Sequence, residues 1–156
     1  MKTLVVGIGN VLLGDDGVGI HALHHLENCL PELNGQVECL DGGTLSFTLA
    51  VPIEDADNLI VIDAAELSSS PGTIKVFEGD AMDTFLGTGP KKSVHEVSLA
   101  DVLSVAAMTD SLPQQRAFIG IQPKTVDWAD EPTIEIQNAI PQASKMARTL
   151  LQRWHA

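Results

Sequence analysis

The sequence predicts an α/β fold: one domain over residues 1–156, with an open, twisted, mostly parallel sheet in the middle of three layers and helices on both faces. Short apolar runs at 3–8 and 58–62 are typical of strands buried on both faces. Segments with helical spacing of apolar residues alternate with the predicted strands, as expected for a parallel sheet. A length of 156 residues suits a single domain with its own core.

The first half of the chain is predicted to hold four elements: a strand at 3–8, a helix at 18–30, a strand at 36–40 and a short helix from about 44 to 51. The first strand is a continuous apolar run. The helix at 18–30 is indicated by near-helical spacing and by Pro31 just beyond its end. The second strand ends at Asp41-Gly-Gly-Thr, where Thr44 or Ser46 can cap the short helix.

The second half is predicted to hold strands at 58–62, 73–78 and 115–121 and helices at 98–108 and 136–154. The run LIVI at 59–62 is the clearest buried strand, and it ends at Asp63. Residues 73–78 alternate in polarity, so an edge strand is expected there. Ser98 and Asp101 resemble a capping box. Residues 66–72, 79–93 and 122–133 are predicted to be turns or loops, with at most one helical turn in 79–93.

Composition narrows the class of partner. A net charge of −12 argues against nucleic acid and against an anionic membrane surface as partners. No apolar run approaches the roughly 20 residues that span a bilayer. The start of the sequence lacks the basic region and the small-residue cleavage site of a signal peptide, so none is expected. Cys29 and Cys39 form no metal or redox motif and are expected to be reduced. A cytoplasmic location is therefore expected. A monomer is also expected, because no long unpaired apolar face stands out.

Acidic residues follow the predicted strands. Residues 7–19, GIGNVLLGDDGVG, join the first strand to the first helix through a glycine-rich loop that carries Asp15 and Asp16. Asp41 and Asp63 follow the second and third strands. Parallel strands bring their carboxyl ends to one sheet edge, where ligands bind near a switch in strand order. Because paired carboxylates have no evident packing use at such a junction, the sequence predicts a ligand site there.

The residue types at this edge suit a metal ion. Asp16, Asp63 and His95 would give a borderline divalent ion two carboxylates and an imidazole, with positions left open for water or substrate. Each residue also has a simpler interpretation. Asp16 can be a helix N-cap, Asp63 a turn former at a strand end, and His95 an ordinary loop histidine. Their clustering favours the metal site.

Other sites have less support. A dinucleotide fingerprint fails because Leu12 occupies the third glycine position and two acids lie where a pyrophosphate would bind. A phospho-acceptor receiver domain would carry its acidic pair directly at the strand end. His21 and His25 are interpreted as a solvated helix face. Trp128, in a polar loop, is either a small packing contact or a partner surface, and packing is favoured. No serine or cysteine nucleophile motif occurs.

Four motifs together resemble the hydrogenase maturation proteases: GIGNVLLGDDGVG at 7–19, DGGT at 41–44, VIDA at 61–64 and SVHEVSL at 93–99. They occur in the family's order and cover most of the chain. The resemblance implies a nickel-dependent endopeptidase that removes the C-terminal extension of a [NiFe] hydrogenase large-subunit precursor after the metal centre is inserted. Nickel in the precursor is then what the protease recognises.

The resemblance also implies roles for individual residues. Asp16, Asp63 and His95 match the family's metal ligands, and Asp16, Asp41 and Asp63 are the expected catalytic acids, with Asp41 in a supporting role. Relatives often carry Glu where this chain has the shorter Asp16. Nickel is expected to arrive with the precursor, and other divalent metals can occupy the site. The alternatives are a non-catalytic nickel-binding accessory protein and a germination-type protease of related fold, which matches the motifs less well.

Overall fold

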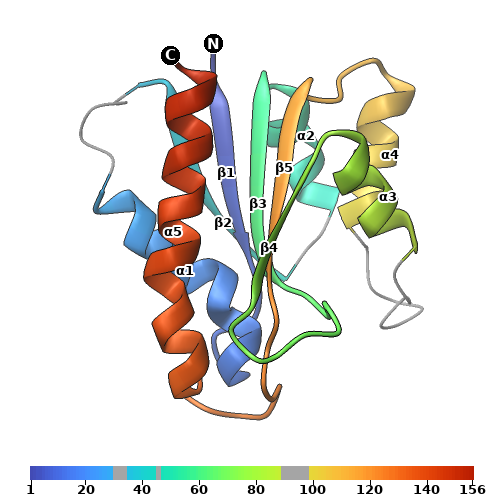
Figure 1. Ribbon diagram of the computed structural model, residues 1–156. Coiled ribbons are helices and arrows are strands. Elements are labelled where there is room, and N and C mark those ends of the chain that lie inside the picture. The colour runs from blue at the N-terminus through green and yellow to red at the C-terminus, as the bar shows by residue number, and fades with distance from the viewer. Residues whose placement is uncertain (30–34, 45–46, 89–98) are drawn as a thin grey trace.

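The computed structural model describes residues 1–29, 35–44, 47–88 and 99–156 (Figure 1). In these segments the chain forms one twisted sheet in the order β2-β1-β3-β5-β4. The strands are β1 (Thr3–Ile8), β2 (Val37–Gly43), β3 (Asn58–Ala64), β4 (Ile74–Glu78) and β5 (Gln115–Ile121). All neighbours pair in parallel except β4, which is antiparallel to β5 at one edge. The predicted fold class and the edge position of the fourth strand are confirmed.

Helices cover both faces of the sheet, as predicted. They are α1 (Val18–Glu27), α2 (Ala50–Glu54), α3 (Asp80–Thr88), α4 (Leu99–Met108) and α5 (Ile134–Trp154). One apolar core lies between the sheet and the pair α1 and α5, and a second lies under α2, α3 and α4 (Figure 1). β1 and β3 lie between the two cores and are almost fully buried. This explains why their sequences are continuous apolar runs.

The clearest error in the predicted elements is α3, because residues 80–88 form a nine-residue helix where a loop with at most one helical turn was expected. Asp80 and Asp83 lie in its first turn, where carboxylates interact favourably with the helix dipole. The helix is fixed by packing: Met82 is fully buried, and Phe85 stacks on Phe77 of β4 with ring centroids 4.1 Å apart. These contacts depend on the sheet and are invisible in a short sequence window.

Other boundaries shift by a few residues. β2 runs to Gly43 instead of ending before Asp41, because its pairing with β1 continues past a bulge: Asp41 lies opposite Gly7, and Gly43 lies opposite Ile8. β3 runs to Ala64, so that Asp63 lies inside the strand. The helix α1 ends at Glu27 rather than at residue 30, and α5 begins two residues before the predicted start. The short second helix lies at 50–54 rather than 44–51, after a 3-10 turn over Phe47–Leu49.

Two further expectations can be compared with the described residues. Cys29 and Cys39 are free thiols, as predicted, and burial raises the pKa of the Cys39 thiol to about 11. No helix in the described segments combines the length and the apolar character needed to cross a bilayer. The predicted capping box at Ser98 lies outside the described residues.

The strand order positions a ligand site. After β1 the chain adds β2 on one side of it, then returns across β1 and adds β3 on the other side. The order therefore reverses between β1 and β3. In open α/β sheets, ligands bind in the crevice outside the carboxyl ends of the strands at such a switch point. Here those ends are Ile8 and Ala64.

Candidate active site

The glycine-rich loop after β1 brings α1 directly onto the ends of two strands. A Cβ atom on Gly19, in the first turn of α1, would lie 2.2 Å from the Ile62 carbonyl oxygen and 2.4 Å from that of Ile8. Gly9 has φ +144°, and a Cβ there would lie 2.0 Å from the carbonyl oxygen of Asp16. The glycines therefore allow backbone to pack on backbone at the switch point.

Asp16 lies in this packed loop, in a 3-10 turn η1 (Gly14–Gly17) that contacts β3. The backbone N–H of Asn10 donates a hydrogen bond of 2.9 Å to Asp16 Oδ2. Asp16 is not a helix N-cap: Leu13 and Gly17 occupy the N-cap positions of η1 and α1, neither with a side-chain cap bond. The simpler interpretation of Asp16 is wrong, and its half-buried carboxylate is held at the carboxyl edge of the sheet.

Asp15, its neighbour, has a structural function that the sequence did not predict. Its side chain is 1% exposed and accepts hydrogen bonds from the backbone N–H groups of Lys124 (2.9 Å), Thr125 (3.1 Å) and Thr133 (2.6 Å). The Thr133 hydroxyl also lies 3.0 and 2.9 Å from its two oxygens. The expectation that both carboxylates lack a packing use is therefore wrong for Asp15, which anchors the loop after β5.

Asp63 and Asp41 lie at the same edge. Asp63 is half-buried in β3, one residue from its end, and is in register with Gly120 of β5. It lies in the strand itself and not in a turn. Asp41 is exposed in β2, and its Oδ1 accepts a 2.8 Å hydrogen bond from the Gly43 N–H across the bulge. The predicted edge thus carries three acids from neighbouring strands: Asp41 in β2, Asp63 in β3 and Asp16 in the loop after β1.

His95, the third predicted metal ligand, lies outside the described residues. Within the described segments, no group of three His, Cys, Asp or Glu side chains is arranged to hold a metal ion. The proposed metal set of Asp16, Asp63 and His95 therefore depends on His95. Two carboxylates and an imidazole fit a borderline divalent ion by ligand chemistry, and acids gathered at one edge favour a cation through their summed field.

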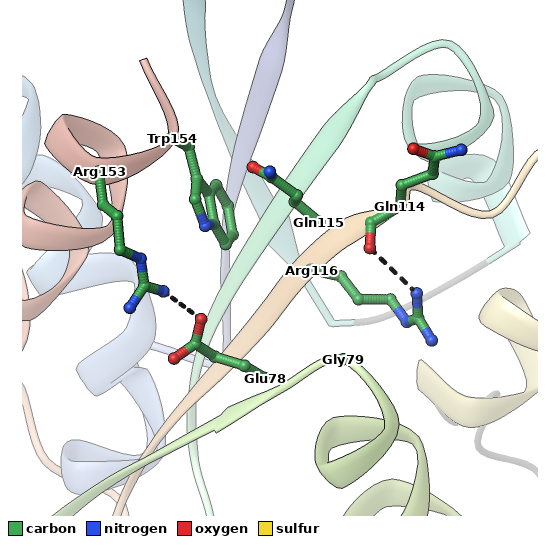
Figure 2. Close-up of a pocket in the computed structure, with 7 residues that line it drawn as sticks. All are labelled: Glu78, Gly79, Gln114, Gln115, Arg116, Arg153 and Trp154. Carbon is green, nitrogen blue, oxygen red and sulfur yellow. Dashed lines mark hydrogen bonds and ion pairs between the residues drawn. The ribbon is translucent and has the colours of Figure 1, made fainter. Parts of the chain in front are cut away.

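An open cavity of ≈ 460 Å³ lies away from these acids. It is lined by Gln115, the first residue of β5, and by Trp154 at the end of α5, so it lies at the opposite, amino edge of the parallel strands (Figure 2). Arg153 and Glu78 form an ion pair in its wall. Trp154 is half-buried against the α1–α5 core and so anchors the end of the last helix.

Three residues near the site differ from expectation or were missed. Trp128 is 77% exposed, so the favoured packing role is wrong. The backbone N–H of Asn10 orients Asp16, and because every residue except proline has this donor, the sequence gives no signal of that role. His21 is half-buried, not on a solvated face, and burial is the main reason that its pKa is lowered. His25 is exposed as predicted.

Sequence comparison identifies similar proteins. A family model described as hydrogenase maturation protease matches residues 20–150. The hydrogenase expression/formation protein HupD of Rhizobium leguminosarum bv. viciae is 36% identical over 154 residues, covering 98% of this chain and 75% of HupD. The hydrogenase 2 maturation protease of Escherichia coli K12 is 33% identical over 130 residues, covering 81% of this chain and 76% of that protein.

Solved structures share the whole fold. The hydrogenase maturating endopeptidase HybD from E. coli superposes with a TM-score of 0.88 at 30% identity, covering 98% of this chain and 93% of HybD. The [NiFe] hydrogenase maturation protease HybD from Thermococcus kodakarensis gives a TM-score of 0.75 at 25% identity, with 96% and 99% of the two chains covered.

Proposed function

This chain belongs to the hydrogenase maturation protease family, and from that premise we propose that it is a nickel-dependent endopeptidase. It removes the C-terminal extension of a [NiFe] hydrogenase large-subunit precursor after the metal centre has been inserted. Members of the family are proteases that process hydrogenase large subunits, and this chain is one of them. Cytoplasmic location and a monomeric state are part of the proposal.

One observation carries the assignment of the site. The order of the sheet reverses between β1 and β3, and Asp16 and Asp63 lie at the carboxyl ends of those two strands. Asp16 is oriented by the Asn10 N–H, and Asp63 is fixed in the strand itself. Carboxylates held on backbone that cannot easily shift are suited to bind an incoming cation without reorganisation.

The proposed roles follow from ligand chemistry. Asp16, Asp63 and His95 would hold the nickel that the precursor carries, so a precursor without nickel would lose this contact and escape premature cleavage. The bound nickel would supply Lewis-acid character next to the scissile bond. Asp41, exposed on β2 at the same edge, would orient the substrate or accept a proton during hydrolysis.

A cleavage assay tests the proposal. The protein is mixed with a [NiFe] large-subunit precursor, with or without nickel loaded, and the mass of the precursor's C-terminus is followed by mass spectrometry. We expect loss of the extension only from the nickel-loaded precursor. His95→Ala should abolish processing, whereas His25→Ala, which alters an exposed histidine on α1, should process normally.

Two outcomes would contradict the proposal in different ways. Normal processing by His95→Ala would remove His95 from the metal ligands. A properly loaded, cognate precursor that stays intact while the protein still binds nickel would instead indicate a non-catalytic nickel-binding accessory protein.

A further inference from the structure

Two loops at the carboxyl edge of the sheet carry exposed apolar side chains. Leu12 and Trp128 are 55% and 77% exposed, and Val11 and Val126 are 37% and 49% exposed. These four residues are called the Leu12–Trp128 patch. They come from two loops, one after β1 and one after β5. Single exposed apolar residues are ordinary on a protein surface, but a cluster of large ones beside a site is typical of an interaction surface.

Backbone hydrogen bonds hold the two loops together. The Ala129 N–H donates to the Leu12 carbonyl (3.0 Å), and the Gly14 N–H donates to the Ala129 carbonyl (3.2 Å). Leu13 and Ala129 form a parallel β-bridge. In this register Leu12 lies opposite Trp128, so the two largest side chains of the patch belong to one surface.

Hydrogen bonds to side chains also anchor both loops of the patch. Its β5 loop is anchored by the buried Asp15 carboxylate through the N–H groups of Lys124, Thr125 and Thr133. On the β1 side, the Leu12 N–H donates to Asn10 Oδ1 (2.9 Å). A tryptophan displayed on anchored backbone loses little freedom on binding, and tryptophan is enriched among the residues that dominate interface energies.

The patch is continuous with the proposed metal site. Asn10 joins them, because its side chain accepts from Leu12 and its backbone N–H donates to Asp16. Both loops lie at the end of the sheet where β1 and β3 finish (Figure 1). A chain that reached Asp16 across this edge would therefore lie on or next to Leu12 and Trp128.

Charge around the patch indicates its partner. Asp127, Asp130 and Glu131 are exposed on the same loop as Trp128, whereas Lys124 of that loop is paired with Glu135. An apolar centre with an acidic rim suits a partner with apolar side chains flanked by basic ones. Resting on the proposed function, we propose that the Leu12–Trp128 patch docks an apolar, basic-flanked segment of the large-subunit precursor next to the bond that is cut.

Steady-state cleavage of nickel-loaded precursor tests this docking. Trp128→Ala and Leu12→Ala should each raise KM, and Trp128→Ala should raise it at least about tenfold, as expected of a dominant interface residue. The value of kcat should change less than about twofold, because the lost contact stabilises the bound substrate and the transition state equally. Met108→Ala, which removes an 85% exposed apolar side chain on α4, is the matched control and should leave both constants unchanged.

A binding measurement separates this inference from the proposed function. In Trp154→Phe the only tryptophan is Trp128, so covering the patch should shift its fluorescence to shorter wavelength when precursor is added, whether or not cleavage follows. Three results would overturn the docking surface: unchanged KM in both patch variants, an equal rise in KM for Met108→Ala, or no fluorescence shift. Cleavage by the unaltered protein would in each case still support the proposed protease function. Failure of the unaltered protein to cleave would overturn the proposed function instead.

Discussion

At the scale of single residues, Asp15 and Asp16 are adjacent but do different things. Among the described residues, Asp15 is buried and accepts from three backbone N–H groups, whereas Asp16 is half-buried and accepts from one. Asp15→Ala leaves buried donors without acceptors and should lower the free energy of unfolding by about 2–4 kcal/mol. Asp16→Ala should lower it by about 1 kcal/mol or less. Urea unfolding of both variants measures the difference.

Cleavage assays on conservative variants complete this comparison. Asp16→Asn keeps the shape of the side chain and should remain folded but lose processing of nickel-loaded precursor. If Asp15→Ala were as stable as the unaltered protein, the anchoring of the loop after β5 would not matter for stability. If Asp16→Asn processed normally, Asp16 would not be a metal ligand.

The position of acids was predictable where it follows a general rule and not where it depends on distant contacts. Asp16, Asp41 and Asp63 were predicted to lie at one edge because the carboxyl ends of parallel strands meet there, and the structure places them at that edge. The role of Asp15 was not predictable, because its partners lie 109 to 118 residues further along the chain. Trp128 was predicted to be a packing contact, because the polar sequence of its loop does not indicate whether the tryptophan side chain is buried or exposed.

At the scale of secondary-structure elements, Gly19 sets how closely α1 approaches the sheet. A Cβ at Gly19 would collide with backbone carbonyls of two strands, at 2.2 and 2.4 Å. Since backbone cannot move away as a flexible side chain can, Gly19→Ala should displace α1 and lower the free energy of unfolding by about 3 kcal/mol or more, at the upper end of overpacking costs. Denaturant unfolding gives the value.

Gly87 provides a matched control for that substitution. It lies in α3, and a Cβ there would meet nothing within 4 Å. Gly87→Ala should therefore raise the free energy of unfolding by about 0.5–1 kcal/mol, the gain in helix propensity. A Gly19→Ala variant as stable as Gly87→Ala would show that α1 can move outward freely and that the close approach is not needed.

Helices and strands were predicted well where their own sequence determines them and poorly where contacts with distant residues do. β1 and β3 are buried on both faces, so their sequences are apolar throughout and their positions were predicted to within two residues. The helix α3 was missed because its stability depends on tertiary contacts. Among these are the stack of Phe85 on Phe77 and the ion pair between Asp83 and Arg116 of β5. Met82, Phe85 and Leu86 do have helical spacing, but the glycines and the proline of 79–93 favoured a loop.

At the scale of the whole molecule, the fold ties its two ends to the central strands, away from the acidic edge. Thr3 at the start of β1 accepts a 3.0 Å hydrogen bond from the Asn58 side-chain amide at the start of β3. The Thr3 hydroxyl also lies 2.7 Å from His155 Nε2, next to the C-terminus of the chain. Hydrogen bonds at the amino edge of the sheet thus join the first strand, the third strand and the last helix, and the carboxyl edge carries the acids.

The net charge of −12 gives a prediction about the whole chain. Folding brings like charges together, and repulsion between them destabilises the compact state. Raising NaCl from about 10 to 150 mM shortens the screening length from roughly 30 to 8 Å. Screening also weakens exposed ion pairs such as Lys2–Glu38 and Lys124–Glu135, but these pairs contribute little to the free energy of unfolding, so little stability is lost. The free energy of unfolding in urea should therefore rise with salt.

A variant with less charge provides the control for this prediction. Asp130→Asn with Glu131→Gln lowers the negative charge by two exposed groups and should make the rise with salt smaller. A free energy of unfolding that stays constant or falls with NaCl would mean that the ion pairs outweigh the repulsion. The same salt series, applied to precursor binding, should weaken it if the docked segment is basic, because screening removes attraction between partners as it removes repulsion within this chain. Salt should thus stabilise the protein and weaken its complex over one concentration range.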